Sequence, residues 1–476
     1  MRRAVARPCH NGSTPCESPS SVPGFPAAHL PSNWRNAPGG TEIRLIGMPE
    51  SFGRGVAYGE ARAEHLLNVR ANELGIDPDD PGGFTAWLNL GARGENRFMP
   101  RLAYGEYLYS RLQDAIQETR ADFRMTPQEA IAVERHDGGF RITLSDGREV
   151  ESDIVVLAVG ALPPQPLHGV GPRLLVDPAY IGWPWQRSLL GDEAIDRIAP
   201  DARVLIVGTG LTMADTVATL QRRRHRGPIV ALSRHGLLPQ AHAQPPSASI
   251  ALPPTVLHAL NSGDVRQLLR ALRALAPILP DWRSLIDALR PYLQAYWKTL
   301  AHEQRARLLR HLRSYWESVR HRLAPEVHAE LLALREEGRL RIRAGRLLRA
   351  RACGQGGVEA LIRERGAAHA ALEHYDVLVR ATWLDTDIEH TTHPLVSQLR
   401  DAGLVSADAF GLGLTASPQS EVLDRHGMAV RGLYCVGPLL RGQLWEITAV
   451  KELRIAARNL GRQLLQNAKG ASPAGD

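Results

Sequence analysis

Residues 203–236, RVLIVGTGLTMADTVATLQRRRHRGPIVALSRHG, decide the fold that we expect for this chain. An apolar run at 204–207 leads into a turn with glycines at 208 and 210, then into a helical pattern, and IVALS follows as a second apolar strand. The order strand, glycine turn, helix, strand is typical of one dinucleotide-binding unit.

The glycine turn of this stretch has the residues that a dinucleotide pyrophosphate needs. Gly208 permits the tight turn, and Gly210 lets the backbone approach the phosphates. A helix that begins near Leu211 presents free amides and its positive dipole end to the same group. Met213 stands where the fingerprint has its third glycine, so an ordinary strand–helix turn is the alternative.

The end of the second strand indicates which nicotinamide cofactor is bound. Ser233 and Arg234 occupy the place where an NAD site usually has an acidic residue for the ribose hydroxyls. A guanidinium can instead bind a 2′-phosphate through two charge-assisted hydrogen bonds. We therefore favour NADP(H) over NAD(H).

One plan occurs twice along the chain. A nucleotide-type segment is followed by a crossover of short strands and then by a buried strand after an aspartate, in SDIVVLAVG and in YDVLVRATW. This repetition predicts an α/β fold with two Rossmann-like dinucleotide-binding domains and a helical insertion. We expect an irregular segment at 1–40, an outer domain at 41–200 and 384–476, and an inner domain at 201–383 with its helical insert at about 253–337.

Composition excludes several classes of protein. The chain carries a formal net charge of +7, and its arginines are scattered among acidic and apolar residues, which does not favour a nucleic-acid surface. No apolar run suits a membrane helix or a secretory signal, so we expect a cytoplasmic protein that acts on a small molecule. We expect no metal site, because no metal-ligand spacing connects the four cysteines, Cys9, Cys16, Cys353 and Cys435.

Four segments carry a resemblance to a known family. They are SFGRGVAYG with the nearby EHLLNV, VGTGLTMAD, LLRHLRSYWESVRHRLAPEV and LYCVGPLLRGQLWEITAVKELR. In this order they resemble the YdhS-like group of bacterial FAD/NAD(P)-binding proteins, which is related to flavin monooxygenases and amine N-hydroxylases. The resemblance runs from about residue 41 to the carboxyl terminus. It implies FAD on the outer domain and the nicotinamide cofactor on the inner domain.

The resemblance also implies positions for the outer cofactor. It places Gly53, Arg54, Gly55 and Tyr58 along the FAD and Asn68 near the flavin. Glycines let a loop lie against a cofactor, and an arginine offsets phosphate charge. Taken singly, a Gly-Arg-Gly segment can equally be only a turn.

Three later positions follow from the same resemblance. Gly160 ends the strand under the nucleotide, Gly437 brings the last strand to the flavin, and the helix after Trp445 directs its amides toward the pyrimidine end. Trp445 equally suits a place in the core. No catalytic residue can be assigned, and we expect His311 and His321 to be surface or packing residues.

These features favour a flavin-dependent NAD(P)H oxidoreductase, and the alternative is a nucleotide-binding protein without turnover. In the first case NADPH passes hydride to FAD, which then reacts with oxygen, as in a monooxygenase, or passes its electrons onward. The alternative arises because CESPSSVPGFPAAHLPSNWRNAPGG stands where the first FAD fingerprint is expected. Gly47, Trp383 and Pro438 also depart from the family pattern. We therefore expect this chain to bind FAD poorly and to expose sheet edges.

We predict that residues 1 to about 38 are an out-of-frame translation of the true FAD fingerprint. Codons that can encode Ser21 and the residues after it, read from their third bases, permit Gly-Ala-Gly-Phe-Ser-Gly, and those of Pro19 and Ser20 permit Val or Ile. That reading restores a strand and a glycine turn ahead of TEIRLIG. Sequencing the DNA tests this: a shifted frame that encodes no such fingerprint contradicts the hypothesis.

Overall fold

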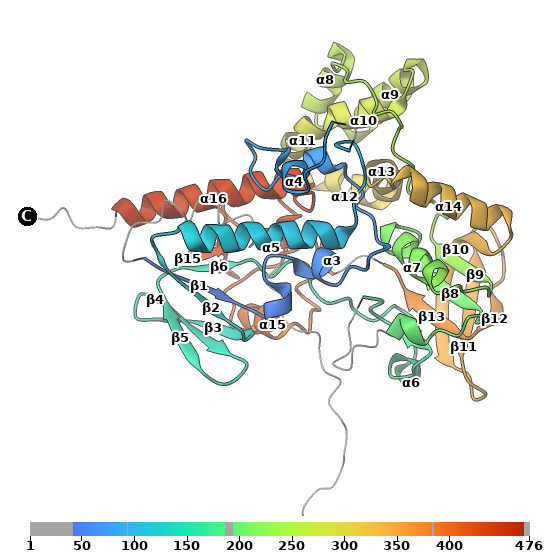
Figure 1. The fold of residues 1–476 in the computed structure, drawn as a ribbon, viewed down its shortest axis with the longest axis horizontal. Coiled ribbons are helices and arrows are strands. Elements are labelled where there is room, and N and C mark those ends of the chain that lie inside the picture. Colours follow the sequence, from blue (N-terminus) through green and yellow to red (C-terminus); the bar gives the residue numbers. More distant parts are fainter. Residues whose placement is uncertain (1–40, 93, 186–193, 383–384, 471–476) are drawn as a thin grey trace, which may run out of the picture.

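The computed structural model describes residues 41–92, 94–185, 194–382 and 385–470 (Figure 1). Figure 1 shows an outer domain on the left, an inner domain on the right and the helices of the insert above them. The expected α/β fold with Rossmann-like domains is confirmed. None of the described helices is both long and apolar enough to cross a membrane.

The inner domain is built on a seven-stranded sheet in the order β12-β11-β10-β9-β8-β13-β7. From β10 to β7 in this order the strands are parallel, and β11 and β12 extend β10 as an antiparallel meander. The strands are β7 (Tyr180–Ile181), β8 (Val204–Val207), β9 (Ile229–Ser233), β10 (Leu340–Ala352), β11 (Val358–Glu364), β12 (Ala371–Tyr375) and β13 (Val377–Arg380). Strand β7 precedes residue 201, where the sequence suggested that this domain begins.

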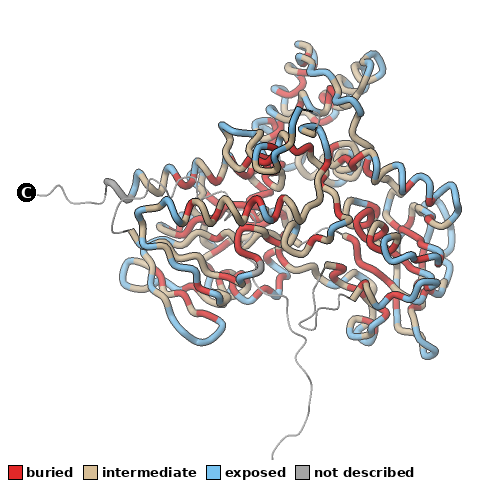
Figure 2. Tube along the Cα trace, viewed as in Figure 1, coloured by how far each residue is buried: buried red, intermediate tan, exposed pale blue. Residues whose placement is uncertain are grey.

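Helices cover both faces of this sheet, which explains the unbroken apolar run of β8. On one face, α7 (Leu211–Arg222) and α14 (Pro325–Glu336) pack through Val217 and Leu331 against Ile206. On the other face, α6 (Pro172–Leu175) contributes Leu174 to the core that holds Leu205. This arrangement buries residues along the strands and on the sides of the helices that face them, as Figure 2 shows.

The outer domain contains two parallel strand pairs, β1 (Glu42–Ile46) with β2 (Asp122–Thr126) and β6 (Val155–Leu157) with β15 (Ala429–Cys435). Ile46 packs against the core cluster that holds Leu157 and Leu433, so both pairs share one core. The strand order of a dinucleotide-binding sheet places one more parallel strand between β1 and β6. In the described part of the chain no strand occupies that position, and the segment 1–40 lies outside the described residues.

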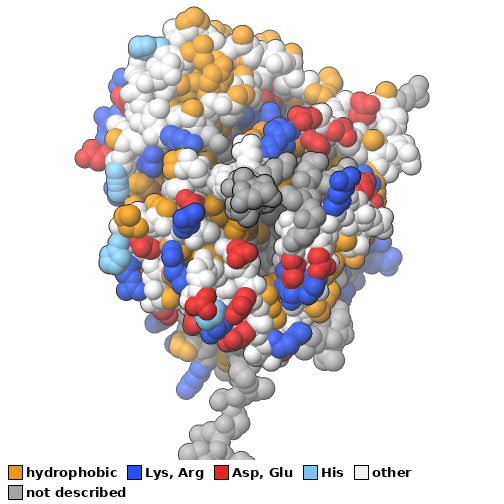
Figure 3. All heavy atoms as spheres, turned by 90° about the vertical axis from the view of Figure 1, so that its left-hand side faces the viewer, with side chains coloured by type: hydrophobic (Ala, Val, Ile, Leu, Met, Phe, Trp, Pro, Cys, Tyr) orange, Lys and Arg blue, Asp and Glu red, His pale blue; other side chains and the backbone are white. Residues whose placement is uncertain are grey.

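The other elements of the outer domain surround this core. A meander of β3 (Ala130–His136), β4 (Gly139–Leu144) and β5 (Glu149–Ser152) forms the crossover, and β14 (Glu421–Leu423) pairs antiparallel with β15. Figure 3 shows basic and acidic side chains interspersed over one face of the molecule, without one basic block in its described part. The helical elements are η1 (Pro49–Ser51), α3 (Gly55–Gly59), η2 (Ala71–Glu73), α4 (Gly83–Trp87), α5 (Arg101–Glu118), α15 (Pro394–Asp401), η6 (Pro438–Leu440) and α16 (Val450–Gly470). In contrast, η3 (Ala194–Arg197) belongs to the inner domain, because Ile195 packs in the same core as Ile206.

The insert is a small helical unit with its own core. Trp297 is buried at its centre, together with Leu412 and Trp445 from the outer domain, so the insert rests on the carboxyl-terminal part of that domain. Its elements are α8 (Pro254–Asn261), α9 (Val265–Leu275), η4 (Ala276–Ile278), α10 (Trp282–Leu289), η5 (Arg290–Tyr292), α11 (Leu293–Thr299), α12 (His302–His311) and α13 (Arg313–Arg320).

Candidate functional site

A cavity of about 480 Å³ lies where the two domains and the insert meet. Tyr58 and Asn68 of the outer domain form one wall, and Leu211 at the start of α7 forms another. Arg320 of the insert and Thr448, just before α16, close the cavity. The amino-terminal ends of two helices from different domains therefore border one space, which suits ligands that carry phosphate groups.

A second hollow, of about 510 Å³, lies beside α7 and α14. Its lining includes the carboxylates of Glu64, Glu326 and Glu330. These groups would repel a phosphate, so the first cavity is the better candidate for a nucleotide site.

The two glycines between β8 and α7 have different structural roles. Gly208 has a φ of 124°, and a Cβ there would lie 2.2 Å from the carbonyl oxygen of Ala381 at the end of β13. Gly210 has a φ of −91°, and a Cβ there would meet no described atom within 4 Å. The fold therefore requires Gly208, whereas Gly210 borders open space that a pyrophosphate can approach.

The glycine turn is held to the end of β9 by hydroxyl groups. The Thr209 hydroxyl donates to the carbonyl of Leu237 at 2.6 Å and lies 2.9 Å from the Ser233 hydroxyl. The Ser233 oxygen also accepts the backbone N–H of Gly236 at 3.0 Å. Ser233 thus shapes the edge of the sheet next to the turn. Met213 is fully buried in the inner core, where a fingerprint glycine would leave space.

Arginines gather beyond the end of β9. Arg234 is exposed. In the neighbouring His235, the ring atom Nδ1 lies 3.4 Å from a guanidinium nitrogen of Arg365. Burial lowers the pKa of His235, and the positive charges of Arg365, Arg234 and Arg346 lower it further. Such a cluster of guanidinium groups suits the 2′-phosphate of NADP(H), as the sequence predicted for Arg234.

The outer-domain residues that the resemblance singled out fall into two groups. Tyr58 and Asn68 line the cavity, and burial raises the pKa of Tyr58 to about 12, so its hydroxyl stays protonated. Gly53 and Gly55 have positive φ values of 74° and 61°. Arg54 lies between them, binds Glu106 at 3.1 Å and stacks on the Tyr109 ring, and it is not among the cavity-lining residues.

The later positions also differ in their surroundings. Gly160 and Gly437 follow β6 and β15 and have φ values of 74° and 114°, which glycine adopts without strain. Trp445 is buried and stacks on Trp297 with ring centroids 4.6 Å apart, so it packs in the core of the insert. Thr448, three residues after Trp445, lines the cavity. Cofactor binding by these residues stays a prediction, and Trp383 lies outside the described residues.

Two contacts that the sequence did not indicate join the outer domain to α7. Arg101, at the start of α5, forms an ion pair with Asp215 at 3.0 Å. Burial raises the pKa of Asp215 to about 6, although Arg101 opposes the shift. Nearby, the buried His65 lies 2.9 Å from the Thr219 hydroxyl. Burial and two nearby arginines lower the pKa of His65 to about 3, so the ring is neutral.

Charged residues also fasten the insert to the segment before α16. Glu446 lies in the segment before α16, and Trp316 and Arg320 lie on α13. The Glu446 carboxylate accepts hydrogen bonds from the Trp316 indole N–H at 2.9 Å and from the Arg320 guanidinium at 2.8 Å. Burial alone would raise the pKa of Glu446, but the charges of Arg320 and His321 and the hydrogen bond from Trp316 together lower it. His321 lines the cavity and pairs with Glu317 at 2.8 Å, whereas His311 is exposed.

The comparisons with known proteins agree with this architecture. Residues 27–162 match the FAD-NAD(P)-binding family model. An ornithine hydroxylase from Pseudomonas aeruginosa and an L-lysine 6-monooxygenase from Pseudomonas syringae each have a TM-score of 0.60 and 16% identity, over 94% of this chain and 97% of theirs. An ornithine N-hydroxylase from Kutzneria sp. 744, described with reduced FAD, NADP⁺ and L-ornithine, has a TM-score of 0.59 and 15% identity, over 94% of this chain and 98% of its own. No curated protein sequence matches the chain. At these identities the likeness shows a shared fold.

The contrast between the two glycines is testable with single methyl groups. We expect Gly208→Ala to destabilise the protein by more than about 2 kcal/mol, because the methyl group meets backbone. Gly210→Ala changes stability by less than about 1 kcal/mol but weakens NADPH binding about tenfold or more, because its methyl fills the approach to the pyrophosphate. Thermal unfolding and NADPH titration measure the two effects. An unchanged NADPH affinity in Gly210→Ala contradicts the assignment.

Proposed function

We propose that the chain is a flavin-dependent NADPH oxidoreductase of the monooxygenase type. The observation that carries the proposal is the convergence of both domains and the insert on one cavity, bordered by the starts of α7 and α16. The family match and the shared fold support it. The four ordered segments favour membership of the YdhS-like group, and we propose a cytoplasmic enzyme with a small-molecule substrate.

The residues of the inner domain fit a nicotinamide dinucleotide. Gly210 leaves room for a pyrophosphate, and the first amides of α7 point their donors to the same place. Arg234, with Arg346 and Arg365 close to His235, supplies charge for a 2′-phosphate. These residues bind and orient the nucleotide, and the shape of the cavity sets how far it enters.

The outer domain and the insert provide the other side of the site. Tyr58 and Asn68 offer a wall for a planar ring, and the turn at Thr448 opens the start of α16 toward it. When FAD is bound, it supplies hydride acceptance and oxygen chemistry that no side chain provides. The protein would therefore hold two nucleotides at one cavity and, through the insert, exclude water.

A nucleotide-binding protein without turnover is the second candidate. Its support is the outer sheet, where β1 and β6 have no strand between them in the described part of the chain. A sheet without this strand lacks the helix end that binds the FAD pyrophosphate. The two candidates therefore differ in whether the chain with a restored amino terminus holds FAD.

Flavin titration of the present chain and of a chain with the restored reading frame tests the proposal. We expect the restored protein to purify with FAD and to lose its yellow absorbance when NADPH is added without oxygen. The present chain should bind FAD about tenfold or more weakly, because its sequence has no glycine fingerprint for the pyrophosphate ahead of β1. A restored protein that stays colourless but binds NADPH favours the second candidate and contradicts the first.

Arg234 should determine the choice between the two nicotinamide cofactors. Replacing it in Arg234→Ala removes a charge-assisted contact to the 2′-phosphate, and such contacts contribute about 1.5–3 kcal/mol. We expect about a tenfold or greater loss of NADPH affinity with little change for NADH. Arg226→Ala is the matched control, because Arg226 pairs with Asp201 and precedes β9 at the opposite end of the strand. Equal losses for both cofactors in Arg234→Ala contradict the assignment.

A further inference from the structure

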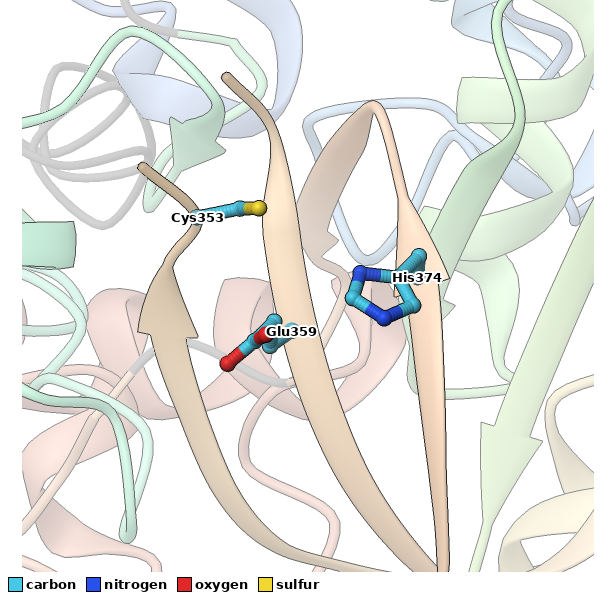
Figure 4. A group of neighbouring side chains, drawn as sticks. All are labelled: Cys353, Glu359 and His374. Carbon is cyan, nitrogen blue, oxygen red and sulfur yellow. The ribbon is translucent and has the colours of Figure 1, made fainter. Parts of the chain in front are cut away.

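The β10–β12 meander of the inner domain carries a second cluster of chemically active side chains. Cys353, Glu359 and His374 come from three neighbouring stretches of chain, and their sulfur, oxygen and nitrogen atoms all lie within 4.8 Å of one another (Figure 4). Figure 4 shows Cys353 and His374 reaching from either side toward the middle strand, which carries Glu359. None of the three lines the cavity.

Strand register places these side chains on one face. Glu359 lies directly opposite His374 on β12 and opposite Arg351 on β10. Cys353 is two residues after Arg351, so the alternation of a strand brings it to the same face. The flanking residues Val358 and Ala360 point the other way, into the core, so the cluster faces outward.

The hairpin that holds Cys353 is tightly constrained. The backbone N–H of Cys353 donates to Gly357 at 2.9 Å, and that of Gly356 returns to Cys353 at 3.0 Å. A Cβ at Gly357 would lie 2.6 Å from the carbonyl oxygen of Tyr375, so β12 lies close against the hairpin. The three donors therefore stand on a stiff framework, and only their side-chain rotamers are adjustable.

We propose that Cys353, Glu359 and His374 form a zinc site with an open fourth position. A thiolate, an imidazole and a carboxylate are the ligands that Zn²⁺ takes, and a set with sulfur and nitrogen disfavours Mg²⁺ and Ca²⁺. Three protein ligands leave one position for water or another ligand. That ligand has access from solvent, because Cys353 and Glu359 are half-buried and His374 is exposed.

The geometry is close to what binding needs. Zinc bond lengths of about 2.0–2.3 Å place the ligand atoms of a tetrahedral site about 3.5 Å apart. The present separations are all within 4.8 Å, so the ligand atoms must approach one another by at most about 1.3 Å to reach that value. Glu359 also pairs with Arg351 at 2.5 Å, but a carboxylate has a second oxygen that can bind the metal. Binding converts the Cys353 thiol to a thiolate, and its proton goes to solvent.

Metal titration of the full chain, stripped with a chelator, tests the site. Co²⁺ serves as a spectroscopic probe, and Zn²⁺ is titrated against a chromophoric chelator. We expect one Zn²⁺ per chain and a thiolate-to-cobalt absorption band that is absent in Cys353→Ser. His374→Ala should weaken Zn²⁺ binding about tenfold or more, because one of three ligands is lost. A Cys353→Ser chain that keeps the band and the stoichiometry overturns the proposal.

Three controls separate this site from other metal binding and from unfolding. The first control is the double variant Cys9→Ser/Cys16→Ser, whose two positions lie outside the described residues. It should keep the cobalt band, and loss of the band in this variant but not in Cys353→Ser overturns the proposal. Arg351→Ala retains all three donors and should bind Zn²⁺ at least as tightly as the unaltered chain. Unchanged NADPH affinity in Cys353→Ser shows that the fold is intact, since the cluster lies outside the cavity.

Discussion

The chain comes so close to itself at the ends of β8 and β13 that no side chain fits between them. A Cβ at Gly208 would lie 2.2 Å from the carbonyl oxygen of Ala381. This contact fixes the start of α7 at the edge where the parallel strands end, which is also the wall of the cavity. The amides of α7 and the arginines beyond β9 reach the same region because that edge collects the carboxyl ends of parallel strands.

The relation between the domains depends on a few buried polar contacts. Arg101 and Asp215 join the outer domain to α7, and Arg320 and Glu446 join the insert to the segment before α16. Removing one partner of a buried ion pair typically costs about 3–5 kcal/mol, so each pair favours one arrangement over looser ones. The cavity between the domains is thus maintained by ion pairs whose arginines, Arg101 and Arg320, line it, and not by the glycine turn alone.

The local pattern of the sequence was sufficient to predict the strands and helix around Gly208, because apolar periodicity and turn glycines are local signals. It could not predict contacts such as Arg101 with Asp215, which join residues far apart along the chain. Cys353, Glu359 and His374 escaped notice for the same reason, since adjacent strands and not sequence spacing bring them together. The site assignments in the outer domain depended on a family resemblance, whereas Ser233 and Arg234 followed from the end of the second strand. The segment to which the reading-frame hypothesis applies lies outside the described residues.

The proposed function requires that two nucleotides meet across one cavity and that hydride passes between them. The most direct measurement is the rate of flavin reduction in the chain with the restored reading frame, with NADPH and with NADPH that carries deuterium at the transferred position. We expect a slower rate of reduction with the deuterated NADPH, and we expect deuterium in the reduced flavin before it exchanges with water. Two results would contradict hydride transfer between the nucleotides. One is equal rates with NADPH and deuterated NADPH together with no deuterium in the flavin, and the other is no flavin reduction by NADPH.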